Sequence, residues 1–306
     1  MKRLLALAAL AALGIAQTAA AAAEWTPVQL ALWNKLQIFS EERDVNGLRL
    51  DLIYGKNEDV RGLDLGLVNN SADLIGIEAG AANWNRGDMI GLQAAALFNG
   101  NESTGDLIGL QLAPALNYAP RADVYGLQLA AGANYLPDGN LYGLQAAAWN
   151  GRAHNVYGLE AGVLLNCTTD LYGLGAALAN YSDGHVYGLQ AGGLLNLNVG
   201  RNPIAGAQVA ALANYAPDAT VHGLQIAAAA NVVADGAVTG LQIAAWNEGK
   251  TLTGLQLGVV NQATTARGAQ IGLVNKSDRM AGFQLGLINI ISSGTVAVCP
   301  LLNVQF

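Results

Sequence analysis

The chain has 306 residues, a formal net charge of −7, and charged side chains at only 12% of its positions. It has no cluster of lysine and arginine that could neutralise phosphates, so the sequence argues against nucleic acid as a partner. Apolar residues make up 52% of the chain, and a surface so poor in charge would be hard to keep soluble.

The N-terminus has the pattern of a secretory signal peptide. Residues 1–3 (MKR) are basic after the initiating methionine, residues 4–15 are apolar, and small side chains lead up to Ala23. The apolar run is too short to span a bilayer, so we expect residues 1–23 to be cleaved off during export. The remaining residues 24–306 have a suitable length for a single β domain built from repeats.

A short unit recurs along the whole mature chain. Residues 62–69 read GLDLGLVN, residues 254–261 read GLQLGVVN and residues 282–289 read GFQLGLIN. Degenerate copies at both ends extend the array to eighteen units between Pro27 and Phe306. Sixteen of these units open with a glycine, namely Gly47, Gly62, Gly76, Gly91, Gly109, Gly126, Gly143, Gly158, Gly173, Gly188, Gly206, Gly223, Gly240, Gly254, Gly268 and Gly282.

Within each unit the large apolar residues occupy every second position, for example Leu63, Leu65 and Leu67. This is the period of a β-strand and not of a helix. The opposite face carries the opening glycine, then a polar residue, then a small one. The polar residue is usually glutamine, and its charged variants are Arg49, Asp64, Glu78 and Glu160.

An asparagine closes most units, and turn-forming residues such as LPDG at 136–139 follow it. Because asparagine tolerates left-handed backbone angles, we expect these residues to form turns and not to bind ligands. In several units the asparagine falls one residue later, which predicts a β-bulge or a slightly longer strand.

Two architectures can use this repeat. In a transmembrane β-barrel the aliphatic face meets lipid and the glutamine face lines the interior. In a β-solenoid the leucines would stack inside and the glutamines would meet water. The even number of units, the aromatic C-terminal Phe306, and tyrosines flanking the strands, such as Tyr125 and Tyr135, favour the barrel.

The sequence therefore predicts an all-β fold, an antiparallel transmembrane β-barrel of about eighteen short strands, with a β-solenoid as the alternative. The many glycines and alanines do not follow from a water-filled lumen, because such residues weaken strands. They indicate that backbones approach closely, either across a flattened barrel or between stacked coils.

Four segments carry a resemblance to a known family. PVQLALWNKLQIF at 27–39, GLRLDLIYG at 47–55, GLDLGLVNN at 62–70 and PLLNVQF at 300–306 together resemble a bacterial surface-repeat family of predicted outer-membrane proteins. The resemblance implies residence in the outer membrane or at the cell surface, and it carries over no catalytic residues. Outer-membrane lipid is then an expected partner, as is the insertion machinery, for which Phe306 would be the assembly signal.

Charged residues that interrupt the repeat are the candidates for an asymmetric site. If a barrel lumen is open, such charges bias ion selectivity. The charged connection at residues 40–44 (SEERD), the longest between units, is a candidate for a constriction or a partner contact. The residues expected to line the lumen are Arg49, Asp51, Asp64, Glu78 and Glu160.

The sequence lacks the motifs of common catalytic and metal sites. Cys167 and Cys299 lie in distant units without metal-binding spacing, and no GxSxG, HExxH or phosphate-binding loop is present. We therefore expect a non-enzymatic protein without cofactor or metal. Its expected role is that of a passive pore or structural surface protein in the outer membrane, or alternatively of a secreted solenoid adhesin or binding surface.

Overall fold

The structure, a computed structural model, describes residues 24–102 and 105–305. The predicted signal peptide, residues 1–23, and the proposed assembly signal Phe306 lie outside the described residues. All regular elements that the structure describes are β-strands, so the all-β prediction is confirmed. No helix in this part of the chain is long and apolar enough to cross a membrane.

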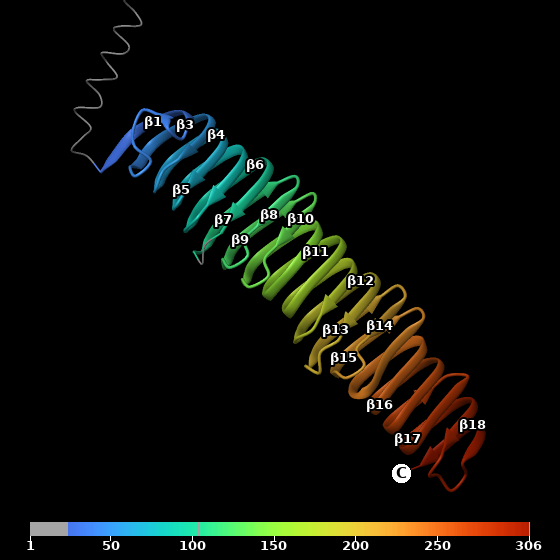
Figure 1. Ribbon diagram of the computed structural model, residues 1–306. Helices are drawn as coiled ribbons and strands as arrows, with labels where there is room; N and C mark the ends of the chain where they lie inside the picture. The colour runs from blue at the N-terminus through green and yellow to red at the C-terminus, as the bar shows by residue number, and fades with distance from the viewer. Residues whose placement is uncertain (1–23, 103–104, 306) are drawn as a thin grey trace, which may run out of the picture. The chain divides into compact units, whose positions relative to one another are not determined.

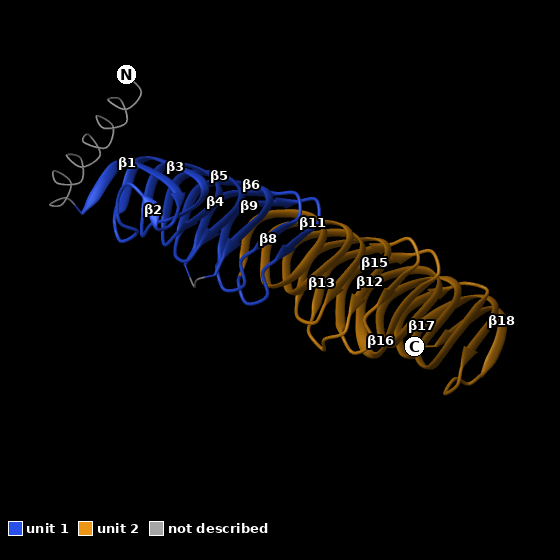
Figure 2. Ribbon diagram, turned by 45° about the horizontal axis from the view of Figure 1, so that its top comes forward, with its two compact units in different colours: residues 1–139 blue, residues 140–306 orange. Residues whose placement is uncertain are grey.

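The chain divides into two compact units, coloured separately in Figure 2 and described one at a time. Unit 1 covers residues 1–139. Its strands are β1 (Trp25–Trp33), β2 (Leu36–Gln37), β3 (Asp44–Lys56), β4 (Val60–Ser71), β5 (Leu74–Asn85), β6 (Met89–Asn101), β7 (Leu107–Ala113), β8 (Leu116–Tyr118), β9 (Val124–Ala130) and β10 (Ala133–Tyr135).

Unit 2 covers residues 140–306. Some of its strands continue through the corners between successive coils and are therefore long. They are β11 (Leu141–Ser182), β12 (Val186–Asn198), β13 (Ile204–Ala210), β14 (Ala213–Tyr215), β15 (Thr220–Ala227), β16 (Ala230–Ile271), β17 (Val274–Ile291) and β18 (Val298–Gln305).

Successive repeats run parallel and in register within each unit. Gly47 lies opposite Gly62, and Gly62 lies opposite Gly76, in unit 1. Gly206 lies opposite Gly223 in unit 2. Each unit is therefore a β-solenoid, in which one repeat makes one coil that stacks on the next (Figure 1). The antiparallel transmembrane barrel predicted from the sequence is wrong, and the alternative of a solenoid is confirmed.

The error has a geometric cause. Each coil contains two strand segments that meet at a corner, as in β7 and β8, which are separated by Pro114 and Ala115. A second turn returns the chain to the start of the next coil. Two short segments and two turns need about as many residues as one membrane-crossing strand of about 9 to 11 residues with its turn. The repeat length therefore fits both folds.

The opening glycines allow the coils to stack closely. All sixteen have φ between +127° and +149°, a region that other residues rarely adopt. A Cβ atom added to Gly254 would lie 2.1 Å from the carbonyl oxygen of Gly240 in the preceding coil. The close backbone approach inferred from the sequence therefore occurs between stacked coils.

Amide side chains form two hydrogen-bonded rows inside each solenoid. In unit 2, Gln225 donates from Nε2 to Oε1 of Gln208 at 2.8 Å, and Gln208 donates in the same way to Gln190. Asn196 donates from Nδ2 to Oδ1 of Asn214 at 2.8 Å. All five side chains are buried.

These rows correct two predictions. The glutamines line the interior of the solenoid and do not meet water, because parallel register places each amide beside its copy in the next coil, where both hydrogen bond. The asparagines lie within strands and not in turns, as Asn117 in β8 and Asn214 in β14 illustrate. A row of mostly large aliphatic residues that faces inward precedes the opening glycine by two residues, for example Val60 and Leu74.

The first and last coils have special closures. In unit 1, Gln29 of β1 exchanges two hydrogen bonds with the backbone of Phe39, so the connection after β1 folds over the first coil. The charged residues 40–44 therefore belong to a cap at this end. In unit 2, β18 reverses direction and pairs antiparallel with β17, and the carbonyl of Cys299 accepts a hydrogen bond from Asn289 at the end of the asparagine row.

Candidate functional site: a buried charged group and an outer aliphatic surface

Four of the charged residues singled out by the sequence come together inside unit 1. Arg49 on β3 lies opposite Asp64 on β4, and donates to its two carboxylate oxygens from Nε at 2.7 Å and Nη2 at 2.5 Å. The Nε atom also lies 3.1 Å from Oδ2 of Asp51. Glu78 follows on β5 and accepts a hydrogen bond from Nε2 of Gln93 at 2.7 Å. All of these side chains are buried.

One guanidinium group faces three carboxyl groups in this cluster, and burial decides which of them hold protons. Desolvation, with a further contribution from the charge of Asp64, raises the pKa of Glu78 well above its ordinary range. Desolvation also raises the pKa of Asp51 to about 7, although Arg49 opposes the change. Arg49 is paired with Asp64, and burial favours the neutral form of Glu78.

The cluster has no access to solvent. The side chains of Arg49, Asp64 and Glu78 have no exposed surface, and Asp51 exposes only 4%. Glu160 is equally buried, but it lies in unit 2, where it accepts a hydrogen bond from Gln145. The lumen that these residues were expected to line does not exist, because the solenoid interior is filled by side chains that hydrogen bond to one another.

The large aliphatic side chains cover the outside. They are most exposed at the corner where each coil passes from its first to its second strand segment: Leu52 and Val163 expose 72% of their surface and Leu97 exposes 60%. We call this corner the aliphatic ridge. Its members are Leu32, Leu52, Leu67 and Leu97 in unit 1, and Val163, Leu164, Leu178, Leu194, Leu212, Val259, Leu273 and Leu287 in unit 2.

The bulges expected from the late asparagines also lie at this corner. Gly80 pairs with Ala95, but the next paired residues are Ala82 and Phe98, so β6 has one residue more than β5 between them. The extra length includes Leu97, which lies on the ridge. The prediction of a β-bulge or a slightly longer strand is confirmed at this coil, where the extra residue enlarges the apolar corner.

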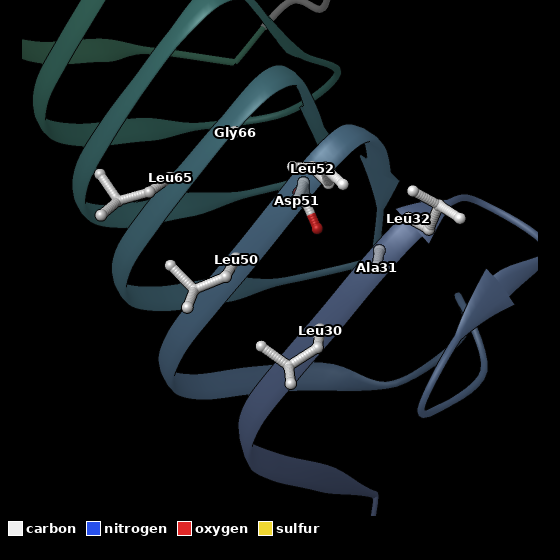
Figure 3. A pocket seen from close by; sticks show the side chains of 8 residues that line it. All are labelled: Leu30, Ala31, Leu32, Leu50, Asp51, Leu52, Leu65 and Gly66. Atoms are coloured by element: carbon white, nitrogen blue, oxygen red, sulfur yellow. The ribbon is translucent and has the colours of Figure 1, made fainter. Parts of the chain in front are cut away.

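A shallow groove of about 520 Å³ runs beside the ridge in unit 1. Leu30, Leu50 and Leu65 project side by side from neighbouring strands along one border of the groove (Figure 3). Leu32 and Leu52 of the ridge stand along the other border. The floor is formed by Ala31, Asp51 and Gly66.

The alternation of apolar residues predicts an aliphatic face, but the ridge has a separate signal in the sequence. Its signal is a pair of adjacent large apolar residues that breaks the alternation, as in Leu67 and Val68 or Val259 and Val260. Two neighbouring residues can both point outward only at a corner or a bulge. The pair before each asparagine therefore marks the corner.

Metal ligands and thiols are the remaining candidates for chemistry in the described part of the chain. No group of three or more His, Cys, Asp and Glu side chains is arranged there to hold a metal ion, and Cys167 and Cys299 are free thiols. Comparisons with family models, with curated proteins and with solved structures found no match to this chain.

Proposed function

We propose that this chain is a non-enzymatic β-solenoid of the bacterial cell surface that acts as a binding scaffold through its outer aliphatic surface. The supporting observation is the reversed distribution of polarity. Glutamine and asparagine fill the interior, whereas leucine, isoleucine and valine face outward. Monomeric soluble proteins rarely expose apolar patches of this extent, and those that do use them for binding.

The buried charges support a scaffold and not an enzyme. Burial raises the pKa of three interior acids, Asp51, Glu78 and Glu160. Glu78 and Glu160 have no exposed surface and the side chain of Asp51 is closed off from solvent, so none of their carboxyl groups can reach a substrate. The secretory pattern of residues 1–23 and the resemblance to surface-repeat proteins support export and a location at the outer membrane.

The proposal is tested on intact cells that express the full-length chain. We expect the mature protein to be recovered with the cell envelope, and an added protease to digest it from outside. Asn substitutions at Leu52, Leu67 and Leu97 should release it from the envelope while its circular dichroism spectrum stays that of a β protein. Recovery of the unmodified protein free in the medium or periplasm, without affinity for washed envelopes, would contradict the proposal.

A further inference from the structure

We propose that the partner of the aliphatic ridge is a lipid surface, into which the ridge inserts from one side without spanning it. The inference rests on the proposed binding function and deepens it. It is drawn from the order in which side chains of different polarity follow one another around a coil.

The first strand segment shows this order on its outer face. In the coil that contains β9, the outward residues are Asp123 at the turn, then Tyr125, then Leu127 and Leu129 toward the ridge. A strand rises about 3.3 Å per residue, so consecutive outward residues are roughly 6.6 Å apart. The surface therefore changes from charged through aromatic to aliphatic over a distance comparable to a lipid headgroup layer.

The second strand segment repeats the order on the other side of the ridge. In β8, for example, the aliphatic Leu116 faces outward, Asn117 is buried, and the aromatic Tyr118 faces outward again. Trp84, Tyr118 and Tyr135 stack along this flank with ring centroids 6.3 and 5.9 Å apart. A charged turn then closes the coil.

Unit 2 has the same arrangement. Tyr142, Tyr157, Tyr172 and Tyr187 stack on its first flank with centroids 4.8 to 5.3 Å apart. Tyr215 is exposed on the second flank, in β14. In each unit aromatic side chains border the ridge on both sides, which is how tyrosine and tryptophan are distributed at the boundary between hydrocarbon and headgroups.

The opposite corner of unit 1 faces away from the ridge and is acidic. An aspartate precedes the inward aliphatic residue in six coils, and its backbone or side chain bonds to the neighbouring coil: Asp44, Asp59, Asp73, Asp88, Asp106 and Asp123. Each coil is therefore amphipathic in cross-section, in the way that an interfacial helix is amphipathic around its axis.

Lipid fits this surface better than a protein partner does. A protein interface is specified by polar groups around an apolar centre. Smaller residues replace the large aliphatic ones at this corner in some coils, for example Ala81, Pro114 and Gly132, and the described coils present no charged side chain there. Acyl chains tolerate such variation because they require only apolar contact. The acidic corner and the net charge of −7 further indicate a preference for zwitterionic over anionic headgroups.

The test uses the purified mature chain with phosphatidylcholine vesicles in a sedimentation assay. We expect binding to these vesicles, and weaker binding at low salt when about a third of the lipid is phosphatidylglycerol. Trp149 and Trp246 are partly exposed close to the ridge, so lipids brominated on the acyl chain should quench the tryptophan fluorescence. Quenching at the acyl chain distinguishes insertion from adsorption at the headgroups.

A matched pair of triple variants locates the contact. Asn at Leu52, Leu67 and Leu97 should lower the partition coefficient at least about 100-fold, since three large aliphatic contacts are lost. Asn at the charged residues Glu42, Glu58 and Arg86, away from the ridge and its aromatic flanks, should leave binding to phosphatidylcholine unchanged. Thermal melts of both variants check that each remains folded.

The outcomes separate this inference from the proposed function. Equal binding by the ridge variant and the unmodified chain, or binding that requires phosphatidylglycerol, overturns the lipid inference. If the protein binds washed envelopes but no vesicles, the scaffold proposal stands and its partner is a protein or glycan. If it binds neither, both proposals fail.

Discussion

Glu160 gives the sharpest test of the buried amide row. It occupies a glutamine position in unit 2 and accepts a hydrogen bond from Nε2 of Gln145 at 2.8 Å. Its own Oε2 and the Oε1 atom of Gln145 have no hydrogen-bond partner. The substitution Glu160→Gln supplies an amide donor that can reach Oε1 of Gln145, as Gln208 donates to Gln190 at 2.8 Å.

The stabilisation expected from Glu160→Gln depends on pH. Burial raises the pKa of Glu160 to about 8, although the hydrogen bond from Gln145 opposes the rise. An unfolded glutamate titrates near pH 4.3, so between about pH 4.3 and pH 8 the folded chain keeps a proton that the unfolded chain loses. The contribution of Glu160 to the free energy of unfolding is therefore fully present below about pH 4.3 and is lost as the pH rises to about 8. The loss reaches about 4 kcal/mol at pH 7 and about 5 kcal/mol at pH 9.

The assay is urea unfolding of the mature chain, followed by circular dichroism at pH 5, 7 and 9. Glu160→Gln should unfold at nearly the same urea concentration as the unmodified chain at pH 5, and at a clearly higher one at pH 9. Glu248→Gln is the control. This residue also lies in unit 2 and accepts a hydrogen bond from Trp246, but at an exposed position, so the same loss of charge should have little effect at any pH.

Two results would refute the reasoning. A stabilisation of equal size at pH 5 and pH 9 would show that the gain comes from hydrogen bonding or packing and not from removal of a buried charge. An absence of stabilisation at pH 9 would show that water reaches the carboxylate and that the interior is not a closed amide core.

Three further predictions concern other interior rows. Gly254→Ala should destabilise unit 2 by more than about 2 kcal/mol in urea unfolding, because the new Cβ atom would overlap the carbonyl oxygen of Gly240. The control is Gly249→Ala, where the nearest atom to the new Cβ, in the side chain of Val238, lies 3.3 Å away. Asn261→Ala should cost about 2 to 4 kcal/mol in the same assay, since buried amides lose their partners, whereas Gln262→Ala should cost far less. Asp51→Asn should reduce the loss of stability that the unmodified chain shows as the pH rises from about 4 to about 7, and leave the part that Glu160 contributes, as measured by thermal melts.

The strand type and the two faces could be predicted from the sequence, because alternation at Leu63, Leu65 and Leu67 fits only a strand. The inward direction of the glutamines was also predicted, although for a barrel and not for the solenoid. Connectivity was missed because the repeat length fits both folds. The discriminating signal was present in the glycines.

In an antiparallel pair, equivalent positions of two repeats lie at opposite ends of the strands, except near the centre. A glycine that opens every strand would then face the end of its neighbour, where no glycine is needed. In a parallel pair, Gly47 lies beside Gly62, and both must lack a Cβ atom. Glycine at one fixed position in sixteen units therefore indicates parallel stacking.

The charged cluster could be predicted only in part. The shared glutamine position of Arg49, Asp64 and Glu78 shows from sequence that they lie on one face. Asp51 lies outside that row. Its contact with Arg49 depends on Gly55, which occupies the position where the next coil has Asn69. A Cβ atom at Gly55 would overlap the Asp51 carboxylate, so the missing side chain makes room for the acid.

The direction of the amide rows explains why the ends of the array differ from its middle. Within each unit an asparagine donates to the next coil and accepts from the previous one, so the first asparagine of unit 1 has no donor in its row and the last asparagine of unit 2 has no acceptor in its row. Asn289 finds its acceptor in the Cys299 carbonyl of β18. Oδ1 of Asn69 has no hydrogen-bond partner. A Cβ atom added to Gly66 would lie 2.3 Å from this Oδ1 atom and 2.7 Å from Cβ of Asp51, so the side chains of Asn69 and Asp51 are neighbours. A protonated Asp51 can supply the missing donor there, which accounts for an acid beside the first asparagine of this row.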